Sequence, residues 1–305
     1  MTPVSTIVIS GGNGLVGQAF ISTLARASSG ARIVRLVRPG SGGEDSVLFD
    51  PAGGSIDAVR LEGCDAVVHL AGEPIAAGRW SVARKARIRS SRVEGTRLVV
   101  DGLGRLKMRP RVLVCASAVG YYGNRGDEQL DEASAPGVGF LSSVAVGWEA
   151  EAARARDLGI RVVSLRLGIV LSAKGGALAR MLTPFRLGAG GPLGDGRQWM
   201  SWIHIDDLVS AIRFTMERED LSGAVNAVAP QPCRNADFTR SLARALRRPA
   251  FLPAPAFALR LALGEMADAL LLSSQRVAPG RLSAAGFTWK HGQLDDALSD
   301  LVSAA

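Results

Sequence analysis

The chain has 305 residues, of which 47% are hydrophobic and 21% charged, with a formal net charge of +8 at pH 7. This composition is typical of a globular protein, and no apolar run reaches the length of a membrane-spanning helix. The three cysteines lack the spacing of metal ligands, and no secretory signal pattern precedes the first strand pattern, so we expect a cytoplasmic protein with reduced thiols.

Short apolar runs alternate with helical patterns over the first two-thirds of the chain. The predicted strands are Thr6–Ser10, Arg32–Val37, Ala66–Leu70, Val112–Ala116 and Val162–Leu167. The predicted helices are Gln18–Ala27, Val82–Leu103 and Val144–Leu158. Near-continuous β-branched runs suit parallel strands covered on both faces, and the alternating order predicts an α/β fold with a doubly wound parallel Rossmann sheet. A ligand of such a sheet binds at the carboxyl ends of the strands.

The first predicted strand runs into a glycine-rich turn that leads to the first helix. Gly11 or Gly12 can adopt the dihedral angles of the turn, and Gly17 lets the helix pack close to the strand. At Gly14 the missing Cβ lets a pyrophosphate approach the backbone and the helix N-terminus. The pattern predicts a dinucleotide site, with a tight strand–helix turn that binds nothing as the alternative. The residues predicted to contact the cofactor here are Gly11, Gly14, Leu15 and Val16.

The second predicted strand ends about twenty residues after this turn, where NAD-binding sheets usually carry an acidic residue for the ribose hydroxyls. The sequence has Arg35 and Arg38 there and no acid. A guanidinium can form charge-assisted bonds with a 2′-phosphate, whereas an acid would repel it. We therefore predict NADP(H) as the cofactor, and an arginine that stacks on the adenine is the alternative.

The third predicted strand ends in His69 and is followed by small residues that let the backbone pass the ribose on the nicotinamide side. We therefore predict cofactor contacts at Leu70, Ala71 and Gly72, with a plain strand end as the alternative. A dense basic stretch follows, Arg79–Arg97, which we interpret as a solvated helix face, with a contribution to an anionic small-molecule pocket as the alternative. No aromatic residues alternate with these arginines, so we expect no nucleic-acid partner, and no membrane partner either.

The composition shifts after Ser172, where a Gly-rich stretch precedes another strand pattern and two helical ones. These are Leu187–Arg197, the strand Ala224–Val228, and the helices Asn235–Arg247 and Ala256–Leu272. We expect residues 1–171, with 201–230 returning to them, to form the dinucleotide-binding domain. Residues 172–200 and 231–305 are expected to form a smaller substrate lobe.

The chain resembles the extended short-chain dehydrogenase/reductases, and specifically their atypical NADP-binding epimerase-family branch, sometimes labelled cell-division inhibitors. The residues that carry the resemblance are Gly11–Gly17, Leu70–Ile75, Arg79–Trp80, Ser91–Val93, Thr96–Arg97, Ser117–Gly126, Gly191–Gly194, Gly196–Asp207 and Gly264–Asp268. The resemblance covers essentially the whole chain, including a segment from about residue 253 that this branch appends. It implies a Rossmann fold that binds NADP(H).

The sequence departs from the active members of this superfamily at one motif. They carry Tyr-x-x-x-Lys on the helix after the fourth predicted strand, where the lysine lowers the pKa of the tyrosine that exchanges a proton with the substrate. Here Phe140 is followed four places on by Val144, and Leu141 by Ala145. Neither alignment supplies a phenol or an ammonium group.

Other side chains are candidates for this proton transfer. Ser117 takes the place of the superfamily serine that bonds a substrate carbonyl, and Tyr121 and Tyr122 follow the same strand, although Tyr122 can equally be a packing residue. Glu73 is an alternative base, and His204 precedes Asp206 and Asp207, which we expect to cap a helix.

Two functions are compatible with these observations. The first is an NADP(H)-binding, epimerase/dehydratase-like short-chain oxidoreductase with an unidentified small-molecule substrate. The second is a non-catalytic NADP(H)-binding or redox-sensing protein. The sequence leaves open whether the chain forms a homodimer.

Overall fold

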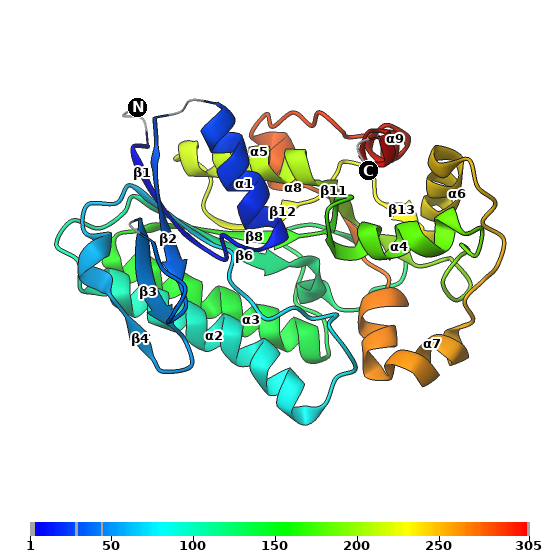
Figure 1. The fold of residues 1–305 in the computed structure, drawn as a ribbon, viewed down its shortest axis with the longest axis horizontal. Coiled ribbons are helices and arrows are strands. Elements are labelled where there is room, and N and C mark those ends of the chain that lie inside the picture. The colour runs from blue at the N-terminus through cyan, green and yellow to red at the C-terminus, as the bar shows by residue number, and fades with distance from the viewer. Residues whose placement is uncertain (1–3, 28–29, 44, 304–305) are drawn as a thin grey trace.

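The computed structural model describes residues 4–27, 30–43 and 45–303 and is built around one eight-stranded sheet (Figure 1). The strand order is β12-β8-β6-β5-β1-β2-β3-β4, and all neighbouring pairs are parallel except β3 and β4. The strands are β1 (Thr6–Ser10), β2 (Arg32–Val37), β3 (Ser46–Asp50), β4 (Ser55–Ile56), β5 (Ala66–His69), β6 (Val112–Ala118), β8 (Arg161–Leu167) and β12 (Gly223–Ala227). This confirms the predicted doubly wound parallel sheet.

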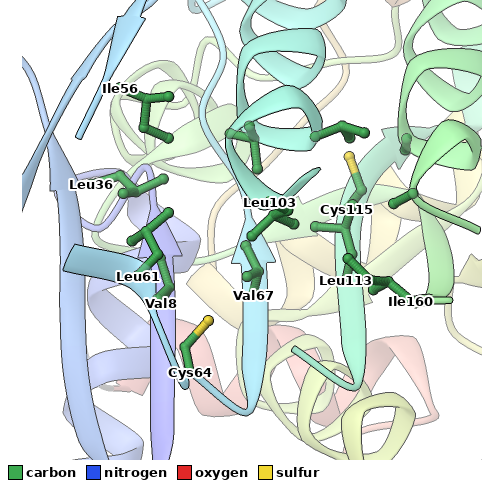
Figure 2. Close-up of a cluster of buried hydrophobic side chains, with 14 of the residues drawn as sticks. Val8, Leu36, Ile56, Leu61, Cys64, Val67, Leu103, Leu113, Cys115 and Ile160 are labelled. Atoms are coloured by element: carbon green, nitrogen blue, oxygen red, sulfur yellow. The ribbon is translucent and has the colours of Figure 1, made fainter. Parts of the chain in front are cut away.

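Helices cover both faces of this sheet (Figure 1). One face carries α2 (Val82–Gly104) and α3 (Phe140–Ala153), and the other carries α1 (Leu15–Arg26), α5 (Ile205–Glu217) and α8 (Gly280–Ala284). Successive side chains of a strand point to opposite faces, so Val8 joins the core under α2 while Ile7 and Ile9 join the core under α1. Figure 2 shows Val8, Val67 and Leu113 of three neighbouring strands in the core under α2.

The remaining elements lie mostly beyond the carboxyl ends of the central strands. The short strands are β7 (Gln129–Leu130), β9 (Ile169–Leu171), β10 (Trp199–Met200), β11 (Trp202–His204), β13 (Cys233–Arg234) and β14 (Arg276–Val277). The helices are α4 (Gly176–Arg186), α6 (Asn235–Leu246), α7 (Ala256–Leu263) and α9 (Leu294–Ser303). Among the residues that the structure describes, no helix is both long and apolar enough to cross a membrane.

The carboxyl-terminal third does not pack as one separate body. Leu298 of α9 packs with Phe238 of α6 in a cluster that also contains residues of α4, β9 and β11. Leu282 and Phe287 instead belong to the sheet core under α1 and α5. Val277 of β14 packs in a further cluster with Tyr122. The predicted limits of the substrate lobe remain a prediction, but part of residues 231–305 covers the main sheet.

The predicted strands agree closely with the observed ones. The differences lie at helix ends, in β3, and in α4 and α9, which the sequence analysis did not predict. The helix predicted to begin at Val144 begins at Phe140, after Gly139 with φ 107°. The helix predicted over Ala256–Leu272 stops at Leu263, because Gly264 has a φ of 62° that ends it. The sequence analysis missed β3, whose buried Val47 and Phe49 alternate with exposed or partly exposed residues.

Candidate functional site

The turn between β1 and α1 requires glycine at two places for different reasons. Gly11 has a φ of 71°, and a Cβ there would lie 2.8 Å from the carbonyl carbon of Leu70. A Cβ on Gly17 would overlap the Gly11 carbonyl oxygen and lie 2.8 Å from the Cα of Gly12. The turn therefore brings the carboxyl end of β1 against the chain that leaves β5.

Gly14 is different, because its backbone is extended, with φ −78° and ψ 169°, and it is exposed. A Cβ there would meet one neighbour, the Gly11 carbonyl oxygen at 3.2 Å. Gly14 is the N-cap of α1, it provides no capping side chain, and the first turn contains no acidic residue. The N-terminal N–H groups of α1 therefore retain their partial positive charge beside an open backbone, which fits a dinucleotide pyrophosphate.

Arg35 lies next to this turn, on β2, where it pairs in register with Ser46 of β3. Its Cδ would be 3.9 Å from a Cβ on Gly12, and its side chain lines a cavity of about 810 Å³. The cavity is also lined by Asn13 and by described residues of the β2–β3 loop, of which Asp45 is ion-paired with Arg32 at 2.7 Å. Arg38 is exposed and is not among the lining residues. Of the two predicted arginines, Arg35 is therefore the one beside the turn.

The end of β5 is held by a buried histidine. His69 is fully buried, and its burial lowers its pKa to about 4, so the ring is neutral. Ser10 Oγ accepts hydrogen bonds from the N–H groups of Leu70 and Ala71, so its own hydroxyl donates to His69 Nδ1 at 2.6 Å. The proton of the His69 ring is therefore on Nε2, which donates to Thr96 Oγ1 at 3.0 Å. These bonds fix Leu70 and Ala71 beside Gly11. The predicted contacts of Leu70, Ala71 and Gly72 with a cofactor stay a prediction.

A buried ionic network holds Ser117 at the end of the neighbouring strand β6. The Ser117 hydroxyl donates to Glu149 Oε1 at 2.6 Å, and the Nε and Nη2 of Arg166 donate to the two oxygens of the same carboxylate, each at 2.8 Å. Burial alone would lower the pKa of Arg166, but the hydrogen bonds and charge of Glu149 outweigh it and raise that pKa. The Tyr121 ring stacks on this guanidinium, with Arg166 Cζ 3.4 Å from the ring centre.

Tyr122, one of the predicted catalytic residues, belongs to the core. It is fully buried, accepts from Arg166 Nη1 at 2.9 Å and donates to Asn226 Oδ1 at 2.8 Å. Burial raises the pKa of Tyr122 to about 12. The enclosed hydroxyl favours the packing interpretation of Tyr122, and its catalytic role stays a prediction. Ser117 and Tyr121 remain candidates.

Sequence reasoning missed Glu149 and Arg166. Each places a charge among mostly apolar neighbours, Glu149 beside Trp148 on α3 and Arg166 between two leucines in β8. A charge is buried at such a position only when it is paired, and that was the available signal.

His204 and Glu73, the alternative candidates for proton transfer, lie at other positions in the fold. The Nδ1 atom of His204 caps α5 by accepting from the N–H of Asp206 at 3.1 Å, so the predicted capping by an aspartate side chain is wrong. The Asp207 carboxylate instead accepts from the backbone N–H groups of Lys290 and His291. Glu73 lies in the loop after β5, 3.8 Å from Arg84.

The sheet, the glycine turn and the uncapped helix N-terminus define a Rossmann-type dinucleotide-binding protein. Residues 7–228 match the model of the NAD dependent epimerase/dehydratase family, and residues 254–301 match a domain of unknown function, DUF1731. The chain belongs to the NAD-dependent epimerase/dehydratase family.

Relatives match the chain over nearly its whole length. "Epimerase family protein Mb2239" of Mycobacterium bovis is 40% identical over 294 residues, 96% of each chain. The human epimerase family protein SDR39U1 is 35% identical over 301 residues, 97% of this chain and 99% of that protein. The crystal structure of human SDR39U1 (isoform 2) with NADPH superposes with a TM-score of 0.90 at 32% identity, covering 98% of this chain and 100% of that one.

Proposed function

We propose that this protein binds NADP(H) and acts as an oxidoreductase of the epimerase/dehydratase type that does without a Tyr-x-x-x-Lys pair. The observation that carries the proposal is the uncapped N-terminus of α1 at Gly14 with Arg35 beside it. The human relative crystallised with NADPH supports the same cofactor. When bound, the cofactor supplies or accepts a hydride at its nicotinamide ring.

Residues of the chain would bind the cofactor and position the substrate. The N–H groups of α1 bind the pyrophosphate, and Arg35 binds the 2′-phosphate. The Ser117 hydroxyl donates a hydrogen bond to Glu149. Its oxygen lone pairs are therefore left to accept a hydrogen bond from a substrate hydroxyl. The first turns of α3 carry Phe140, Leu141 and Val144, so this helix contributes neither a phenol nor an ammonium group there.

A second function, NADP(H) binding without turnover, is favoured by one observation. The phenol of Tyr122, which follows β6, is enclosed by Arg166 and Asn226. Proton transfer then has no evident phenol to use beyond Tyr121. A redox sensor would need the cofactor site and no such group.

Arg35→Ala is expected to weaken NADPH binding by about 10- to 150-fold, because a charge-assisted hydrogen bond contributes about 1.5–3 kcal/mol. NADH, which has no 2′-phosphate, should bind with unchanged affinity. Fluorescence titration of both cofactors measures the ratio. The control is Arg38→Ala, for which we expect a smaller change because Arg38 does not line the cavity. An Arg35→Ala protein that still prefers NADPH as strongly as the wild type contradicts the assignment.

Turnover on general substrates of the superfamily is expected to be slow, because general acid–base catalysis typically contributes about 10²–10⁴-fold. The measurement is steady-state NADPH oxidation with sugar nucleotides, quinones and small aldehydes. Ser117→Ala should lower any turnover, whereas Tyr122→Phe should leave the rate per folded molecule unchanged. If both variants retain rapid turnover, the proton transfer would be assigned to Glu73 or His204 instead.

A further inference from the structure

The loop between β5 and α2, residues 70–81, is held by arginines. Arg92, Arg84 and Arg180 donate to backbone carbonyl oxygens of this loop at 3.1, 2.6 and 2.6 Å. The loop has one acidic residue, Glu73, whose carboxylate is 3.8 Å from Arg84. Guanidinium groups therefore outnumber carboxylates around the loop, and the local charge is positive.

Arg92 and Arg180 have no carboxylate partner among the described residues, and of these two Arg92 is the less exposed. Arg92 is partly buried, and its Nη1 makes its two hydrogen bonds, to the carbonyl oxygens of Glu73 and Ile88. Among the described residues, no carboxylate lies within 4.0 Å of it, and Nε and Nη2 have no hydrogen-bond partner. Burial lowers the pKa of Arg92 to about 10, and the charge of Glu73 offsets this only in part. The guanidinium of Arg92 therefore has no carboxylate partner, and its free Nε and Nη2 can pair with an anion.

The position of Arg92 separates it from the 2′-phosphate site proposed at Arg35. Its Cζ and Nη2 atoms would each lie 3.2 Å from a Cβ on Gly72, just beyond β5. Its Cζ is 5.1 Å from the ring centre of Trp148, the residue before the glutamate that holds Ser117. Arg35 belongs to β2, on the other side of β1 in the sheet. A dinucleotide with its pyrophosphate at α1 and its 2′-phosphate at Arg35 therefore extends its nicotinamide half toward β5, β6 and Arg92.

We propose that Arg92 binds a carboxylate of the substrate, and that the substrates are small carboxylic acids with a carbonyl or hydroxyl group next to that carboxylate. The planar fork of Nε and Nη2 matches the two oxygens of a carboxylate. In the direction of reduction, the carbonyl carbon takes the hydride of NADPH and the carbonyl oxygen takes one proton, which gives the hydroxy acid and NADP⁺. This inference rests on the proposed function, because it takes the hydride donor from there.

The test titrates oxamate and malonate into the protein saturated with NADPH and follows nicotinamide fluorescence and the melting temperature. Lactamide is the neutral control ligand. Arg92→Gln removes the charge, and Arg87→Gln is the matched control, because Arg87 is an exposed residue of the same helix. We expect wild type and Arg87→Gln to bind the carboxylates, and Arg92→Gln to bind them about 10- to 100-fold more weakly, with an unchanged affinity for NADPH.

Several results would overturn the inference. These are equal carboxylate binding by Arg92→Gln, no carboxylate binding by the wild-type NADPH complex, or equally strong binding of lactamide. A tenfold loss of NADPH affinity in Arg92→Gln would assign the guanidinium to the cofactor instead. Arg92→Lys, which keeps a charge but not the fork, should bind the carboxylates with intermediate affinity. A wild-type protein that does not bind NADPH refutes the proposed function itself, which is a separate outcome.

Discussion

Gly14→Val is expected to abolish NADPH binding and to leave the protein folded. The backbone at Gly14 is extended, the residue is exposed, and the nearest atom to an added Cβ is the Gly11 carbonyl oxygen at 3.2 Å, so the fold tolerates a side chain. The valine would fill the space over the N-terminus of α1 that the pyrophosphate needs. The dissociation constant, measured by fluorescence titration, should rise more than about 100-fold, because several charge-assisted hydrogen bonds are lost together.

Gly17→Val is the contrasting variant. Its Cβ would overlap the backbone of Gly11, so the turn and α1 could not keep their positions, and we expect little folded protein by circular dichroism. Normal NADPH binding by Gly14→Val would show that the phosphate-binding turn has been assigned to the wrong residues. Loss of the folded state in Gly14→Val would show that the residue serves the fold rather than the ligand.

Glu149→Ala is expected to destabilise the protein by about 3–5 kcal/mol, because it leaves the charge of Arg166 buried without a partner. The Arg166 side chain is 4% exposed and donates two hydrogen bonds to this carboxylate. Urea denaturation measures the loss, which should appear as a lower midpoint with an unchanged slope.

The control for this experiment is an ion pair at the surface. Asp220 pairs with Arg218 at 2.6 Å, and both side chains are well exposed, so Asp220→Ala should change the stability little. Glu149→Gln keeps the shape but not the charge, and it should lie between the wild type and Glu149→Ala. If Glu149→Ala were as stable as Asp220→Ala, the buried network would not be the support of Ser117 that its hydrogen bonds indicate.

The sequence predicts the central strands because their signals are local. β1 and β2 are runs of apolar residues whose ends coincide with the observed ones, and the glycine turn is a motif of contiguous residues. β3 was missed because its apolar run, Val47–Phe49, has only three residues, which is too short for a clear strand pattern. The end of α7 depends on the backbone conformation of one residue, Gly264, which a helical pattern does not reveal.

The site shows the same division between local and long-range information. Arg35 was predicted from its spacing to the glycine turn, but only the folded chain shows that its side chain, and not that of Arg38, reaches the cavity. The Glu149–Arg166 pair joins two elements that are 17 positions apart, and no spacing rule connects them. The uncompensated charge of Arg92 is visible only once burial and the absence of a carboxylate among its described neighbours are known.

The packing of the carboxyl-terminal segment has a consequence for how the chain can be divided. The two family matches, 7–228 and 254–301, read as two modules in the sequence. Yet Leu282 lies in the core under α1, Val277 packs against Tyr122, and Leu298 packs against Phe238. A chain cut between the matches would expose apolar surface in all three clusters, so we expect the first match alone not to fold stably. The whole chain should unfold in a single cooperative transition, and the second segment can be inherited or lost only together with the cores that it completes.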